Sequence, residues 1–122
     1  VVKTMIQKEI KVKGSKALVL GITFKENCPD SRNTKVVDVV AALKTYGMEV
    51  CVYDPIANAQ EVKQAHGLGI QQNLPQEKFD SVVLAVAHTC FEELNYKNLL
   101  KDKAILYDVK GMLQNKYVDS AL

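Results

Sequence analysis

Short apolar runs alternate with helix-like segments along the chain. The runs are long enough for strands but far shorter than the ~20 residues of a membrane span. Strands are predicted at residues 17–20, 49–53, 81–86 and 104–107, with a weaker one at 70–71. Helices are predicted at 34–46 and 57–66, one or two short helices at 90–101, and a short amphipathic helix at 1–12. The tail up to Leu122 is polar and is expected to fray.

The helix at 34–46 needs an argument, because its start is rich in valine and propensity alone favours a strand there. Its length, the Ala-Ala-Leu continuation and the stop at Gly47 decide for a helix. Ser31 or Asn33 is the expected N-cap, since both residue types accept backbone hydrogen bonds at helix starts.

Alternating strands and helices predict the fold class α/β, a three-layer α/β/α, Rossmann-like doubly wound parallel sheet. With the five predicted strands in the order 3-2-1-4-5, the loops at 22–33, 87–92 and 108–112 meet at one edge. These loops and the helix start behind the first of them would gather five polar residues there: Lys25, Arg32, Lys35, His88 and Lys110.

The loop after the first strand is about a dozen residues long, against the usual two to six. Open α/β sheets bind anionic ligands between such a strand and the next helix N-terminus. Lys25 and Arg32 in this loop are therefore candidate anion ligands, with solvated loop charges as the plain alternative. Lys110 has the same two alternatives, an anion ligand or a solvated charge. His88 fits either a turn cap or a ligand contact.

Three further features have plain alternatives. Asp54 lies where an NAD site carries its ribose-binding acid, but the turn after Gly21 lacks the GxGxxG pattern, so a turn or cap role is favoured. Cys28 is a candidate nucleophile without a visible base, which favours an incidental thiol. A response-regulator receiver is ruled out, because the required acidic pair after the first strand is replaced by Thr-Phe-Lys.

The 122 residues and 48% apolar composition indicate one domain with a real core. A net charge of +2 gives no reason to expect nucleic acid, and no membrane partner or signal peptide is expected. The three cysteines have neither disulfide-framework nor zinc-site spacing, so we expect no metal site and a reducing cytoplasm. The start at Val1 without a methionine indicates a fragment.

Four motifs together resemble one family. They are LGITFKENCPDSRNT at 20–34, VYDP at 52–55, AVAH at 85–88 with Phe91, and YDVKG at 107–111. In order and spacing they are similar to the C-terminal, UDP-binding domain of the UDP-glucose/GDP-mannose 6-dehydrogenase family, over residues 14–115. The details most resemble the bacterial branch that oxidises UDP-N-acetylhexosamines for capsule, Vi-type or O-antigen polysaccharide.

The resemblance implies that this chain is one domain of a longer protein whose domains have different functions. Family members oxidise C6 of a nucleotide sugar twice with NAD⁺, which their N-terminal domain binds, and they dimerise through a central helix. Residues 1–13 would be the end of that helix and residues 14–122 the nucleotide-sugar domain. This chain would then carry no catalytic residue, would be inactive alone, and would act in a cytoplasmic homodimer with its own N-terminal NAD domain.

The resemblance also assigns site residues. Phe24 and Lys25 match positions that contact UDP, with Lys25 on phosphate, and Lys110 matches a cation near the uridine diphosphate. His88 and Phe91 fall beside the substrate site, and Arg32 matches an arginine directed at the cofactor or sugar across the domain interface. The alternative is a free-standing, non-catalytic nucleotide-binding or regulatory module.

Overall fold

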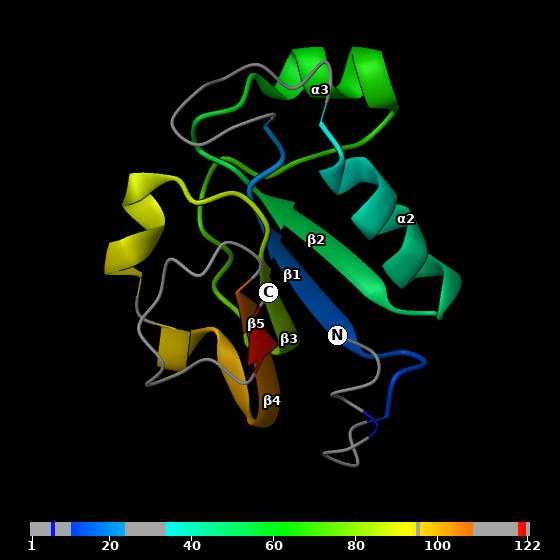
Figure 1. The fold of residues 1–122 in the computed structure, drawn as a ribbon, viewed down its shortest axis with the longest axis vertical. Helices are drawn as coiled ribbons and strands as arrows, with labels where there is room; N and C mark the ends of the chain where they lie inside the picture. Colours follow the sequence, from blue (N-terminus) through cyan, green and yellow to red (C-terminus); the bar gives the residue numbers. More distant parts are fainter. Residues whose placement is uncertain (1–5, 7–10, 24–33, 95, 109–119, 122) are drawn as a thin grey trace.

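A parallel sheet forms the centre of the computed structural model, which describes residues 6, 11–23, 34–94, 96–108 and 120–121. Its strands are β1 (Lys16–Leu20), β2 (Glu49–Tyr53), β3 (Phe79–Leu84), β4 (Leu100–Asp108) and β5 (Ser120–Ala121). They lie in the order β2-β1-β3-β4-β5, and every neighbouring pair is parallel (Figure 1). The predicted strands at 17–20, 49–53, 81–86 and 104–107 are thus confirmed, with shifts of a few residues at their ends.

The predicted order is confirmed as well. β1 lies between β2 and β3, so the chain reverses its direction of winding at the β1/β3 pair. The weak strand at 70–71 is reduced to a single bridge between Gln71 and Tyr53, on the outer side of β2. β5 was not predicted, because a two-residue strand in a polar tail has no periodicity to reveal it.

Between the strands, the described residues form the helices α2 (Val36–Thr45) and α3 (Ala59–His66) and the 3₁₀ segments η1 (Thr89–Glu93) and η2 (Tyr96–Asn98). α2 buries Val36, Val40 and Leu43, which recur at helical spacing, and Gly47 follows its end at a φ of +80°. The predicted N-cap at Ser31 or Asn33 is wrong. Lys35 is the N-cap, and the Thr34 hydroxyl accepts the Val36 N–H at 3.1 Å.

The sheet is covered on both faces, which confirms the three-layer α/β/α architecture. On one face, side chains of α2 and α3 such as Val40 and Val62 pack with Val19 and Val83. On the other face, the 3₁₀ region packs Phe91 and other side chains against the alternate positions of β1, β3 and β4. Figure 1 shows α2 and the 3₁₀ segments on opposite sides of the sheet.

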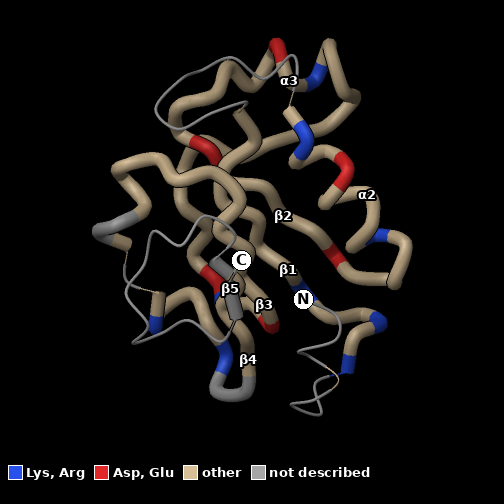
Figure 2. The backbone as a smooth tube through the Cα atoms, in the orientation of Figure 1, with Lys and Arg blue, Asp and Glu red and all other residues tan. Residues whose placement is uncertain are grey.

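The expected helix at 1–12 lies outside the described residues except for Ile6, Lys11 and Val12, so the proposed boundary at residue 13 stays a prediction. Each of α2 and α3 carries an acidic residue in its first turn and a lysine in its last turn (Figure 2). No helix among the described residues has the length and apolar character needed to cross a membrane.

Candidate functional site

Three neighbouring strands end in one row at the carboxyl edge of the sheet. Leu20 of β1 is in register with Leu84 of β3, and Leu84 is in register with Asp108 of β4. The segments that carry the predicted site residues all continue from this row. Sequence reasoning predicted this convergence from the strand order, and the register confirms it for the described strand ends.

Gly21 allows the first of these segments to leave β1. Its φ is +94°, and a Cβ added there would lie 2.5 Å from the Cβ of Val86, closer than any real side chain tolerates. Its N–H donates to the Tyr53 carbonyl at 3.0 Å, while Ala85 and Val86 donate to the Leu20 carbonyl. A glycine is therefore required where the chains after β1, β2 and β3 approach one another.

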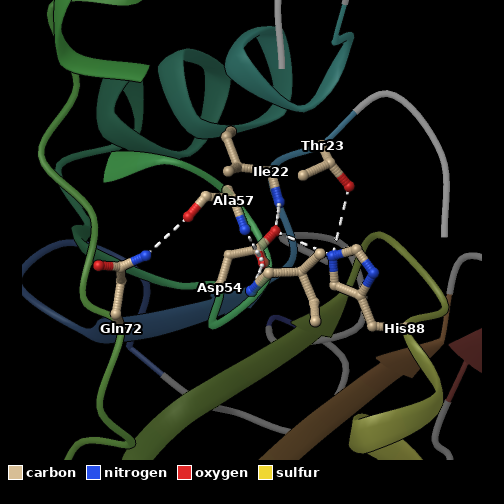
Figure 3. A network of polar contacts seen from close by, with 7 residues as sticks. Ile22, Thr23, Asp54, Ala57, Gln72 and His88 are labelled. Carbon is tan, nitrogen blue, oxygen red and sulfur yellow. Dashed lines mark hydrogen bonds and ion pairs between the residues drawn. The ribbon is translucent and has the colours of Figure 1, made fainter. Parts of the chain in front are cut away.

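Asp54, directly after β2, closes the turn that leads to α3. Its Oδ1 accepts the N–H of Ile56 at 2.8 Å and that of Ala57 at 2.9 Å. Gln72 holds the far side of this turn by donating from Nε2 to the Ala57 carbonyl at 2.7 Å (Figure 3). The turn role that the sequence favoured for Asp54 is thus confirmed.

The second carboxylate oxygen of Asp54 reaches across the edge. Oδ2 accepts the Ile22 N–H at 2.8 Å and lies 3.0 Å from Nε2 of His88, and both Asp54 and His88 are fully buried (Figure 3). Burial raises the pKa of Asp54, but the hydrogen bonds from His88, Ile22 and Ala57 and the charge interaction with His88 outweigh it and hold the pKa below its ordinary value. Asp54 therefore stays ionised inside the protein.

These contacts decide against a cofactor role for Asp54. An ionised carboxylate has about four acceptor sites, and the four hydrogen bonds fill them. None remains for a ribose hydroxyl. With the GxGxxG pattern absent after β1 as well, the described part of this edge does not fit NAD in the manner of a dinucleotide-binding domain.

His88 and Phe91 lie beside this network and are both fully buried. Nε2 of His88 also lies 3.3 Å from the Thr23 hydroxyl, and its ring packs on Phe91 at a centroid distance of 5.3 Å. Phe91 in turn packs against Tyr53 at 6.0 Å and accepts a hydrogen bond from the Tyr96 hydroxyl at its carbonyl. In the structure, His88 and Phe91 support the loop after β3. The contact of these two residues with substrate stays a prediction.

The thiols of the described chain are not activated. Cys90 is exposed near the edge, and partial burial and then the negative charge of Asp54 raise the pKa of its thiol. Cys51 is half-buried, and burial and then Glu77 raise its pKa as well. Both thiols are therefore protonated at neutral pH and are poor nucleophiles. Cys28 lies outside the described residues.

The remaining predicted site residues, Phe24, Lys25, Arg32 and Lys110, also lie outside the described residues. Lys35 is exposed at the N-terminus of α2. The hydrogen bonds of Asp54 with Ile22 and His88 were not predicted from the sequence. The one sequence signal for these bonds is an acidic residue directly after the strand that neighbours β1.

Comparison with known proteins gives a consistent result. Residues 18–115 match the model of the UDP-binding domain of the UDP-glucose/GDP-mannose dehydrogenase family. A UDP-N-acetyl-D-glucosamine 6-dehydrogenase of Salmonella typhi is 40% identical over 124 aligned residues, which cover 99% of this chain and 29% of that protein. Protein CapL of Staphylococcus aureus is 40% identical over 117 residues, covering 94% of this chain and 28% of CapL.

Solved structures agree on the fold. An NDP-N-acetyl-D-galactosaminuronic acid dehydrogenase of Methanosarcina mazei superposes with a TM-score of 0.82 at 23% identity, over 95% of this chain and 25% of that one. A UDP-D-ManNAc dehydrogenase of Pyrococcus horikoshii superposes with a TM-score of 0.77 at 21% identity, over 98% and 28%. The chain thus spans less than a third of the length of these proteins.

Proposed function

Because the chain belongs to the UDP-glucose/GDP-mannose dehydrogenase family, of which it is the UDP-binding domain, we propose that it forms the nucleotide part of a UDP-sugar site. The complete enzyme would oxidise C6 of a UDP-N-acetylhexosamine to the carboxylate for a bacterial surface polysaccharide. The observation that carries this proposal is the 40% identity to UDP-N-acetyl-D-glucosamine 6-dehydrogenases over 99% of the chain.

The geometry of the described edge supports the assignment. Lys25 follows Thr23 by two residues, and Lys110 follows Asp108 by two residues, so both lysines continue from the row of strand ends formed by β1, β3 and β4. We propose that Lys25 and Lys110 bind the diphosphate and that Phe24 contacts the uridine. A diphosphate is best held by cations at a place where backbone N–H groups also converge.

We propose that this chain alone does not carry out the redox step. The described edge does not fit NAD, so we propose that NAD is bound mainly by an N-terminal domain of the complete enzyme and that Arg32 faces it across the domain interface. We further propose a cytoplasmic homodimer, joined through the helix of which residues 1–13 are the end. A free-standing regulatory module is not favoured, because the relatives that match almost the whole chain are dehydrogenases.

Steady-state kinetics of the complete enzyme test this assignment. Lys25→Ala should mainly raise the KM for the UDP-sugar, because Lys25 holds phosphate in every domain arrangement. Arg32→Ala should lower kcat by roughly 10- to 100-fold, as expected for one charged contact of about 1.5–3 kcal/mol made in the assembled state.

Lys101→Ala is the control for both variants. Lys101 pairs with Asp80 at 3.2 Å, at the starts of β3 and β4, so its loss should leave both kinetic constants unchanged. Wild-type kinetics in both Lys25→Ala and Arg32→Ala would contradict the proposed site.

A further inference from the structure

The buried Asp54 carboxylate joins three chain segments that leave the sheet at the same edge. It binds Ile22 after β1, Ile56 and Ala57 after β2, and His88 after β3. We propose that Asp54 is a positioning residue for the nucleotide-sugar site, which acts through Ile22 and His88 on the segment leading to Lys25. This inference rests on the proposed function, because it concerns the same site.

The segment after β1 is fixed at two successive residues. The Ile22 N–H donates to Oδ2 of Asp54 at 2.8 Å, and the Thr23 hydroxyl lies 3.3 Å from Nε2 of His88, which in turn lies 3.0 Å from Oδ2. Ile22 and Thr23 are 0% and 1% exposed. Asp54 and His88 therefore fix the position of Ile22 and Thr23, which directly precede Phe24 and Lys25 in the sequence.

The negative charge of Asp54 is what allows all these contacts at once. Oδ1 and Oδ2 must both accept hydrogen bonds, because both oxygens face backbone N–H groups. An asparagine has one accepting oxygen and one donating NH₂ group. It can keep the turn at Ile56 and Ala57, but its NH₂ group then faces the Ile22 N–H. Asp54→Asn thus preserves the local turn and breaks the link to the segment after β1.

Asp80 offers a matched control at the opposite end of the same sheet. Its Oδ2 accepts the Lys16 N–H at 2.8 Å, the same length as the Asp54–Ile22 bond, and also binds Nζ of Lys101. Because both Asp80 contacts fall on one oxygen, an asparagine would keep them, so the control is Asp80→Ala, which removes a backbone link of the same length without touching the carboxyl edge. A general loss of sheet stability would affect both variants, and a positioning effect only the Asp54 variant.

The test combines titration of UDP into the 122-residue chain with amide hydrogen exchange. In Asp54→Asn we expect the Kd for UDP to rise about tenfold or more. We also expect faster exchange at Ile22 while Ile56 and Ala57 stay protected. In Asp80→Ala the Kd should stay within about twofold of wild type, as for sites without shared partners.

A second pair of variants covers the case in which Asp54→Asn does not fold. His88→Gln keeps an N–H donor for Asp54, whereas His88→Leu removes it, so His88→Gln should bind UDP more tightly than His88→Leu. Equal binding by these two, or wild-type binding by a folded Asp54→Asn, would overturn the positioning role and leave the proposed function standing. Failure of the wild-type chain to bind UDP would overturn the proposed function, and the positioning role with it.

Discussion

At both ends of the sheet an aspartate side chain binds a backbone N–H group, but the two aspartates differ in burial and in their other partners. At each end an aspartate accepts a backbone N–H from β1 or its continuation at 2.8 Å: Asp54 from Ile22 at the carboxyl edge, Asp80 from Lys16 at the amino edge. Asp54 is fully buried and makes four hydrogen bonds. Asp80 is 17% exposed, and its second partner is the amine of Lys101.

The difference follows from solvent access. Water can satisfy part of the Asp80 carboxylate, so an exposed lysine is a sufficient partner. The Asp54 carboxylate is removed from water, so every acceptor site must be filled by the protein. The result is that the edge from which the predicted site loops continue is fixed by a buried network, whereas the opposite edge is held by contacts open to solvent.

The largest contrast is expected for two glycines near these ends. Gly21 at the carboxyl edge and Gly14 before β1 both have positive φ, +94° and +83°, but only Gly21 has a side chain within 4 Å of an added Cβ. Gly14→Ala should cost about 1–2 kcal/mol for the backbone alone. Gly21→Ala should cost about 2–6 kcal/mol, because the contact with Val86 adds to that strain. Chemical denaturation measures both, and equal losses would contradict the crowding inferred at Gly21.

Removing each carboxylate entirely sharpens the same contrast. Asp54→Ala leaves three backbone N–H groups, two of them buried, and the His88 donor without their acceptor, and should cost about 3–5 kcal/mol of unfolding free energy. Asp80→Ala frees the Lys16 N–H close to solvent, and should cost about 1 kcal/mol. Denaturant titrations of the two variants decide the matter. A loss for Asp80→Ala as large as that for Asp54→Ala would show that burial does not set the difference.

The acid dependence of stability gives a smaller effect. The pKa of Asp54 is lowered in the folded state from its ordinary 3.8, so its stabilising contribution is present above pH 3.8 and is lost as the pH falls through the folded value. Wild-type stability should therefore fall faster than that of Asp54→Asn as the pH drops below about 3.8. Denaturation midpoints measured at several acidic pH values test this, and parallel curves for the two proteins would contradict it.

Most of the framework of the fold was predictable from local pattern. The apolar runs that became β1, β2 and β3 are short and uninterrupted, and Gly47 and Gly67 mark helix ends with positive φ. The convergence at the carboxyl edge followed from strand order alone, since parallel strands share an edge. β5 and the N-cap at Lys35 escaped prediction, because they depend on contacts rather than on sequence spacing.

The candidate site was predictable only in part. Asp54 was correctly assigned to a turn, because the residues it binds there are two and three positions away. Its bonds to Ile22 and His88 span 32 and 34 positions, and no periodicity reports such a pairing. The complete burial of His88 was equally invisible, since a lone histidine in a loop gives no sign of its surroundings.

Calorimetric titration of UDP and of uridine into this chain tests the proposed nucleotide-sugar site most directly. If cations at the carboxyl edge bind the diphosphate, two charge-assisted contacts of roughly 1.5–3 kcal/mol each make UDP bind at least tenfold more tightly than uridine. Lys25→Ala should reduce that preference, and Lys101→Ala at the amino edge should leave it unchanged. Equal affinity of the wild-type chain for UDP and uridine would contradict the assignment of this edge as a diphosphate site.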